Sequence, residues 1–145
     1  MKAILAIDQG TTGTTVAVMN TRGALLGSVN YEFPQIYPKP GWVEHDPEAI
    51  WASALKGIRA VFRRGLCKPN DVACIGITNQ RETSLLWERR SGKPLGNAIV
   101  WQCRRTASFC EGLRKKGLEP MVRDRTGLVL DPIFRRASSA GCSTI

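Results

Sequence analysis

A chain of 145 residues, 43% of them apolar and 23% charged, has the size and composition of one globular domain with one core, which excludes a disordered tail. The formal net charge of +9 raises the question of nucleic-acid binding, but the basic residues cluster mostly late in the chain and lack the interleaved aromatic residues of a base-stacking surface. We therefore expect a solvated basic surface, weakly attractive to anionic nucleotides, and no nucleic-acid partner.

The five cysteines include no CxxC pair, and His45 is the only histidine. This pattern argues against a zinc site and against a disulfide framework, and it favours reduced thiols in the cytoplasm. The first residues contain fewer apolar positions than a secretory signal needs, and no run approaches the roughly 20 apolar residues of a membrane span. We expect a cytoplasmic chain with no membrane partner.

The opening stretch predicts a hairpin. Residues 3–7 are aliphatic and β-branched, which favours a buried strand, and residues 16–19 predict its return strand. Between them, Gly10 and Gly13 are expected to make a tight turn with positive φ and to let a ligand approach the backbone.

The turn of this hairpin is rich in threonine. Its hydroxyls are those of Thr11, Thr12, Thr14 and Thr15, and the successive amides of the turn can form a nest that holds an anion. Asp8, at the end of the strand, can orient a hydrated cation beside that anion. A phosphate-binding hairpin that presents a carboxylate to Mg²⁺ is the functional interpretation. The alternative is an ordinary Gly/Thr hairpin.

A third strand over residues 24–29 completes a three-stranded meander. Residues 31–45 contain three prolines and predict a long loop, and their aromatic residues favour packing of this loop onto the body of the protein. Asp46 is a typical helix N-cap with Pro47 at the first helical position, and apolar residues at helical spacing predict a helix to about Arg64. The aromatic residues of the loop are Tyr31, Phe33, Tyr37 and Trp42.

Residues 72–77 are continuously apolar, which is typical of a central strand buried on both faces. Three antiparallel strands, a crossover helix and a buried strand predict a mixed α/β layer fold. This order resembles the ribonuclease H-like nucleus of actin-type ATPases and sugar kinases, in which the first hairpin grips phosphate.

Six polar residues, 78–83, follow the apolar run. Ligands of open α/β sheets bind at the carboxyl ends of strands, so this position favours a binding role. Arg81 offers a rigid fork of donors and Glu82 a two-oxygen acceptor, which together suit vicinal hydroxyls. The alternative is an Arg/Glu pair on a solvated loop.

Residues 84–88 and 98–101 predict two further strands around a turn, and residues 106–116 predict a helix. Trp101, which ends the second strand, can lay its ring along a short carbon chain as aromatic residues do in sugar sites, or it can fill the core. The expected inner stripe of the helix is Phe109, Cys110 and Leu113.

Five motifs in series are more specific than any one of them: DQGTTGTT, FPQIYPKPGWVEHDPEAIW, IGITNQRET, GKPLGNAIVWQCRRT and TGLVLDP. In order and spacing, over residues 1 to about 134, they resemble the FGGY family of carbohydrate kinases, and within it the branch that phosphorylates glycerol. Xylulokinases of the same family differ where this chain reads NQRET, which favours a polyol. The resemblance implies transfer of a phosphoryl group from ATP to the terminal hydroxyl of glycerol, with Mg²⁺.

The resemblance also assigns a nucleotide site. It implies that Thr11, Thr12 and Gly13 contact the nucleotide phosphates and that Asp8 helps to hold the metal, directly or through water. Thr15 departs from the pattern, because the family commonly has an arginine there that strengthens contact with the phosphates.

The polyol site follows in the same way. The resemblance implies that Arg81 and Glu82 bind the glycerol hydroxyls and that Trp101 packs on its carbons. Ile133 stands where the family commonly has a tyrosine that binds glycerol, so one hydroxyl is lost from the site.

Family members are far longer and have two domains, so the resemblance implies that residues 1–134 are an incomplete N-terminal domain without the general base. Phosphoryl transfer needs groups on both sides of the phosphate, and we expect little or no kinase activity. Residues 135–145 diverge. Codons can be chosen so that one base inserted after Phe134 gives a family-like helix start, which favours a gene broken by a one-base deletion.

An incomplete sheet would leave an unpaired edge and exposed apolar surface, which predicts self-association or aggregation. Another hypothesis is a non-catalytic remnant that binds phosphate or polyol weakly or docks on an intact kinase. A ribonuclease H-like nuclease is disfavoured, because Asp8 and Glu82 lack the further acids of a two-metal site.

Overall fold

The computed structural model describes residues 2–133. The chain divides into two compact units, which we describe one at a time. Unit 1 consists of Met1–Pro34 and Asp46–Gln80, and unit 2 consists of Gln35–His45 and Arg81–Ile145. The expected domain boundary and the divergent tail, residues 135–145, lie outside the described residues.

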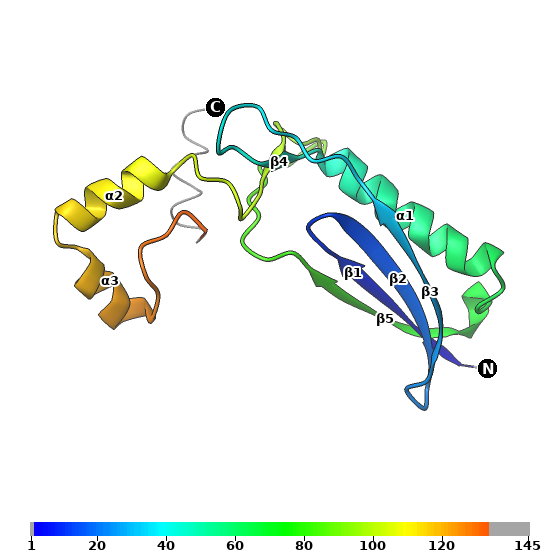
Figure 1. The fold of residues 1–145 in the computed structure, drawn as a ribbon. Coiled ribbons are helices and arrows are strands. Elements are labelled where there is room, and N and C mark those ends of the chain that lie inside the picture. Colours follow the sequence, from blue (N-terminus) through cyan, green and yellow to red (C-terminus); the bar gives the residue numbers. More distant parts are fainter. Residues whose placement is uncertain (1, 134–145) are drawn as a thin grey trace. The chain divides into compact units, whose positions relative to one another are not determined.

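Unit 1 contains a four-stranded sheet in the order β3-β2-β1-β5 (Figure 1). Its first three strands are antiparallel, which confirms the predicted meander, and the fourth runs parallel to β1. Along β1 every second residue is buried, which is the pattern of a strand with one covered face. The strands are β1 (Ala3–Gln9), β2 (Gly13–Asn20), β3 (Leu25–Glu32) and β5 (Val72–Asn79).

The helix α1 (Pro47–Arg63) covers one face of this sheet and confirms the predicted crossover helix (Figure 1). The Asp46 carboxylate accepts a hydrogen bond from the backbone N–H of Glu48 at 2.9 Å, so the predicted N-cap is present. A short 3-10 turn, Pro69–Asp71, precedes β5. The buried core between helix and sheet is formed by Ala3, Leu5, Ile7, Val16, Val18, Val29, Ala60 and Val61.

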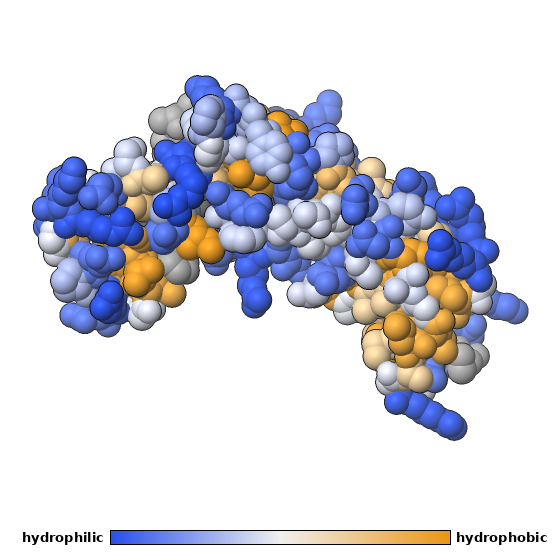
Figure 2. All heavy atoms as spheres, in the orientation of Figure 1, coloured by the Kyte–Doolittle hydropathy of each residue, from blue (hydrophilic) through white to orange (hydrophobic). Residues whose placement is uncertain are grey.

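The expectation that β5 is a central strand buried on both faces is wrong. Residues 73–79 are exposed, and Ile77 retains 73% of its accessible surface. Among residues 2–133, β5 is an edge strand that pairs only with β1. Its faces are exposed because α1 packs mainly against β2 and β3. Apolar surface also gathers on unit 1 near the N-terminus (Figure 2). The expected unpaired edge is therefore present in the described part of the chain.

Unit 2 contains a two-stranded antiparallel sheet, in which Glu44 pairs with Ile99 and His45 pairs with Ala98. Its regular elements are β4 (Glu44–His45), β6 (Ala98–Ile99), α2 (Ala107–Lys115) and α3 (Glu119–Thr126). The helix predicted over residues 106–116 is confirmed as α2, whereas α3 was not predicted. No helix among residues 2–133 has the length and apolar character needed to cross a bilayer.

The two strands predicted in unit 2 are mostly absent. Residues 84–88 contribute only isolated bridges, Ser84 with Ile99 and Trp87 with Pro94, and regular strand structure is confined to β6. Pro94 has no N–H to donate, which limits the ladder on that side.

Of four side chains whose burial was predicted, the structure confirms the burial of two. Phe33 is buried as expected for the packed loop, but Tyr37 retains 68% of its surface and does not pack. The 31–45 segment is also less irregular than expected, because β3 enters it and β4 ends it. In α2, Cys110 is buried as predicted, whereas Phe109 is exposed.

Candidate functional site

The β1–β2 turn is tight, as predicted, but its two glycines do not have the predicted positive φ. The Gly10 N–H donates to the Gly13 carbonyl at 2.9 Å. Neither glycine has a positive φ, so that expectation is wrong. A Cβ at Gly13 would lie 2.8 Å from the Tyr31 carbonyl oxygen, and one at Gly10 would lie 3.1 Å from the Gly13 oxygen. Close backbone approach therefore requires glycine here.

Thr14 anchors this turn to α1 by a buried contact that sequence reasoning did not identify. Its hydroxyl lies 2.7 Å from the Ser53 hydroxyl, which donates to the Ile50 carbonyl at 2.7 Å. Because Ser53 has one hydrogen to give, Thr14 is the donor of the first bond. The next hydroxyl, on Thr15, accepts a hydrogen bond from the Asn30 amide at 2.8 Å. Both hydroxyls thus serve the fold.

The two preceding threonines lie at the bend between β1 and β2. Thr12 is exposed and Thr11 half-buried, and the Thr12 carbonyl accepts from the Phe33 N–H at 3.3 Å. Two successive residues at a bend, following Gly10, present backbone and side-chain polar groups at the end of β1. Such a bend is suited to hold a phosphate.

Asp8 is exposed near the carboxyl end of β1, in register with Thr15 on one neighbouring strand and Thr78 on the other. Mg²⁺ is commonly held by one or two carboxylates together with substrate phosphates, so a single exposed carboxylate next to a turn of this kind is chemically suited to this ion. The described residues contain no group of three or more His, Cys, Asp or Glu side chains that could hold a metal.

The carboxyl ends of the parallel strands β1 and β5 meet within unit 1. The Gln80 N–H donates to the Gln9 carbonyl at 2.6 Å, which continues the ladder one residue beyond β5. The predicted polyol residues begin with the next residue in the chain, Arg81, which is exposed.

Glu82 has an unusual backbone. Its φ is 60°, and it is the one residue other than glycine with positive φ in the described part of the chain. Such a conformation costs about 1–3 kcal/mol and is typically retained at functional positions. The adjacent Thr83 Oγ1 is buried and has no hydrogen-bond partner among residues 2–133. Neither feature was predicted from the sequence.

Trp101 follows β6 and is half-buried, so part of its surface is open to a ligand. The backbone before it is fixed: the Val100 N–H donates to the Val43 carbonyl at 3.1 Å, and Val100 is buried. Ile133 is also half-buried, and its N–H donates to the Asp131 carboxylate at 3.0 Å.

A buried ion pair in unit 2 supports the segment before α1. Arg105 donates to the Glu44 carboxylate, and its guanidinium stacks 3.9 Å from the centroid of the Trp42 ring. Asn97 donates to the same carboxylate at 3.0 Å. His45, which follows Glu44 in the chain, is fully buried and hydrogen-bonded to Gln35 at 2.6 Å. Burial lowers the pKa of its imidazole. Sequence reasoning missed this network.

Known proteins match nearly the whole chain. The chain is 51% identical over 133 residues to a glycerol kinase of Caldanaerobacter subterraneus subsp. tengcongensis, and 54% identical over 133 residues to a glycerol kinase of Salmonella arizonae. Both alignments cover 92% of this chain, but only 27% and 26% of those proteins. The chain thus spans about a quarter of the length of these curated relatives.

A solved structure agrees. The crystal structure of Plasmodium falciparum glycerol kinase with ADP matches with a TM-score of 0.85 and 33% identity, covering 95% of this chain and 28% of that one. The model for the N-terminal domain of the FGGY family of carbohydrate kinases matches residues 3–137. The chain therefore belongs to the FGGY family of carbohydrate kinases, as a part of its N-terminal domain.

Proposed function

We propose that this chain carries the phosphate-binding turn and the polyol-binding residues of an enzyme that transfers a phosphoryl group from ATP to glycerol. The observation that carries the proposal is the turn at the end of β1, where Gly10 and Gly13 close the backbone and Thr11 and Thr12 present polar groups. The two curated relatives described above are glycerol kinases, and a glycerol kinase solved with ADP has a similar structure.

In this proposal the nucleotide is held in unit 1. The amides and hydroxyls of Thr11 and Thr12, with the adjacent Gly13, bind the phosphate oxygens, and the Asp8 carboxylate holds Mg²⁺ directly or through water. The metal ion neutralises charge on the phosphates when it is bound. An arginine at the position of Thr15 would add a phosphate contact, and Thr15 instead accepts from Asn30.

The polyol is bound by residues of unit 2. Arg81 donates to the glycerol hydroxyls, Glu82 accepts from them and the open part of the Trp101 ring packs on the carbons. The strained backbone of Glu82 supports this role, because strain is kept where a function needs it.

We further propose that a polypeptide of these 145 residues binds its ligands but has little or no turnover. Positioning and charge stabilisation are needed on both sides of the transferred phosphoryl group. The short span of the chain relative to its relatives supports this, since they contain much more sequence. A weak phosphate- or polyol-binding remnant is the physical state that this predicts.

Self-association and cellular location complete the proposal. The β5 edge carries no charged residue from Val72 to Asn79, so no charge on the strand itself opposes strand pairing with a second copy. Four cysteines in the described residues are free thiols, which supports a reducing cytoplasm: Cys67, Cys74, Cys103 and Cys110.

The phosphate site is tested by calorimetric titration with Mg²⁺–ADP. We expect saturable binding that weakens roughly tenfold or more in Asp8→Ala, because the metal loses its protein carboxylate. The matched control is Asp124→Ala, which removes an exposed carboxylate on α3 and should leave the dissociation constant unchanged. Absence of binding by the folded wild-type chain would contradict the proposed phosphate turn, and equal binding by Asp8→Ala would contradict the role of Asp8.

A further inference from the structure

Two residues of the proposed polyol site are attached to one short strand of unit 2, β6. The Ile99 N–H donates to the Ser84 carbonyl at 2.8 Å, and the Ser84 N–H donates to the Ile99 carbonyl at 2.9 Å. Glu82 lies just before Ser84 in the chain, and Trp101 lies just after Ile99. The position of β6 therefore sets the starting point of both the Glu82 and the Trp101 segments.

β4 holds β6 on its other side. Its residues Glu44 and His45 pair with Ile99 and Ala98 of β6 in an antiparallel ladder. Two short strands share few ladder hydrogen bonds, and a two-stranded sheet is only marginally stable by itself. Contacts of side chains must therefore supply much of the order in this part of unit 2.

The Glu44 carboxylate supplies such contacts at both ends of the segment that contains β6 and Trp101. Asn97, directly before β6, donates to Oε2 of Glu44 at 3.0 Å, and Arg105, which follows Trp101, donates to Oε1 through Nη2. These two contacts span 53 and 61 positions of the sequence. One carboxylate thus joins the two ends of segment 97–105 to β4.

The ion pair at the second contact is shielded from water. The Arg105 side chain retains 3% of its accessible surface and the Glu44 side chain 13%. The guanidinium stacks 3.9 Å from the centroid of the Trp42 ring, and its Nε donates to the Cys103 Sγ at 3.1 Å. A buried ion pair adds little net stability compared with apolar side chains of similar volume, because both charges lose their hydration. Its presence here favours a need for one defined geometry.

The strained backbone of Glu82 has the same need. Its φ is 60°, and such conformations persist only where the surrounding structure holds them. The chain directly after it is held at Ser84 by β6, and β6 is held by β4. The contacts of the Glu44 carboxylate are therefore among those that hold this backbone.

We infer that Glu44 is a positioning residue of the polyol site, a role that rests on the polyol-binding function proposed above for Glu82 and Trp101. Both oxygens of the Glu44 carboxylate accept from donors of the chain itself, so it acts through segment 97–105 and not by touching the polyol. Removal of its charge releases this segment and leaves the Arg105 cation buried without a counter-charge.

The test uses the complete chain labelled with fluorotryptophan and observed by fluorine NMR. The chain has four tryptophans, and the resonance that disappears in Trp101→Phe belongs to Trp101. Titration with glycerol shifts this resonance and gives the dissociation constant of glycerol. Calorimetric titration with Mg²⁺–ADP on the same sample reports separately on the nucleotide site of unit 1.

We expect Glu44→Gln to weaken glycerol binding roughly tenfold or more, because displaced binding groups lose most of their effect, and to leave the dissociation constant of Mg²⁺–ADP unchanged. In the absence of glycerol, the Trp101 resonance of this variant should broaden or split, since the ring then occupies more than one position. A merely structural role would reduce the folded fraction and so weaken both ligands in parallel.

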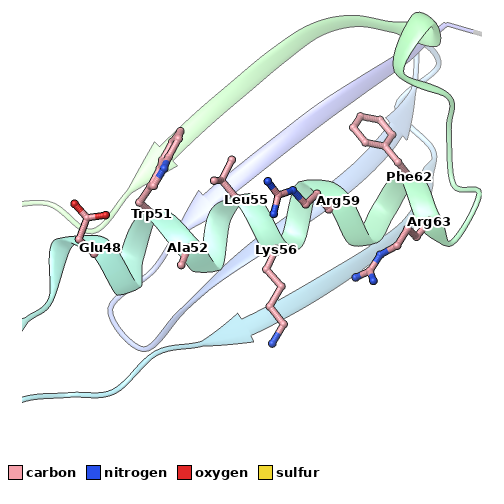
Figure 3. A pocket seen from close by; sticks show the side chains of 8 residues that line it. All are labelled: Glu48, Trp51, Ala52, Leu55, Lys56, Arg59, Phe62 and Arg63. Atoms are coloured by element: carbon pink, nitrogen blue, oxygen red, sulfur yellow. The ribbon is translucent and has the colours of Figure 1, made fainter.

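Glu48→Gln is the matched control. Glu48 follows Glu44 closely in the chain and is exposed. Figure 3 shows its carboxylate at the start of α1, away from the cations Arg59 and Arg63 of the same helix. This substitution removes the same charge, and it should change neither glycerol binding nor the Trp101 resonance.

Asn97→Asp tests the other contact at an exposed position. It replaces a donor to the Glu44 carboxylate by a second carboxylate, and the repulsion between like charges should weaken glycerol binding several-fold. Circular dichroism checks the folding of each variant. Should Glu44→Gln not fold, the result for Asn97→Asp decides.

Two results would contradict the role of Glu44 while leaving the polyol site in place. One is wild-type glycerol binding and an unchanged Trp101 resonance in the folded Glu44→Gln chain, and the other is a parallel loss of glycerol and Mg²⁺–ADP binding. Failure of the wild-type chain to bind glycerol is a different outcome, because it would contradict the proposed polyol site and the role of Glu44 together.

Discussion

The absence of a side chain at Gly57 allows α1 to lie close to the sheet. A Cβ at this position would lie 2.5 Å from Cγ2 of Val16, a contact that requires either the helix or the strand to move. The glycine persists within a helix although alanine is favoured there by up to about 1 kcal/mol. Packing therefore overrides helix propensity at this residue.

We predict that Gly57→Ala lowers the free energy of unfolding by about 1–3 kcal/mol, the usual cost of overpacking a core. The matched control is Gly112→Ala in α2, where nothing lies within 4 Å of the added methyl. That substitution should raise stability by about 0.5–1 kcal/mol through helix propensity. Urea denaturation of both variants checks the prediction, and a stabilising Gly57→Ala would contradict the observed packing.

His45 predicts a pH dependence of stability. Burial lowers the pKa of its imidazole from the ordinary value of 6.5, so the unfolded chain takes up a proton before the folded chain does. As pH falls below 6.5, the unfolded state is therefore favoured, and the stability present at higher pH is lost.

The measurement is the free energy of unfolding from pH 7.5 downward, in roughly half-unit steps. We expect the wild type to lose more stability than His45→Gln over this range, because glutamine keeps a polar side chain near Gln35 but does not titrate. Equal slopes in the two proteins would show that other groups cause the pH dependence.

At the scale of elements, β5 turns its unpaired backbone groups outward. The Gln80 N–H points to β1, and amides alternate along a strand, so those of Ile75 and Ile77 point away from β1. Such an edge can pair with another strand unless a charge or a bulge prevents it. This is the physical basis of the proposed self-association.

We predict that Cys74→Lys reduces concentration-dependent association, because lysine on an edge strand opposes pairing. Cys74 is in register with Ile4, on the face of the sheet opposite to Ile75 and Ile77, so the substitution leaves the face of these isoleucines unchanged. Leu25→Lys adds the same charge at an exposed position outside β5. Sedimentation velocity distinguishes the two variants, and an equal effect of both would show that net charge, not the edge, controls association.

The elements that could be predicted are those whose start, end or periodicity is marked by residues within the segment itself. Asp46 and Pro47 mark the start of α1, and alternating aliphatic residues mark the meander, so both could be predicted. The burial of β5 could not, because a continuous apolar run does not reveal whether a second layer covers it. The prediction of two strands within residues 84–101 was mostly wrong, because strand pairing there depends on partners that are distant in sequence. The pairing of Glu44 with Ile99 is an example.

At the scale of the whole molecule, candidate binding residues were easier to identify from the sequence than the backbone conformations and hydrogen bonds around them. The roles of Asp8, Arg81 and Glu82 remain predictions from motif and residue chemistry. The left-handed backbone of Glu82 and the Thr14–Ser53 hydrogen bond were not predictable, since both arise from packing between segments remote in sequence.

The most direct measurement of the central claim is a coupled ADP-release assay on the purified chain with glycerol and Mg²⁺–ATP, beside Asp8→Ala. If these 145 residues hold the ligands without the groups that complete the reaction, the folded chain shows no glycerol-dependent ADP release above that of the variant. Glycerol-dependent turnover that disappears in Asp8→Ala would contradict the account, because it would show that this chain completes the site by itself.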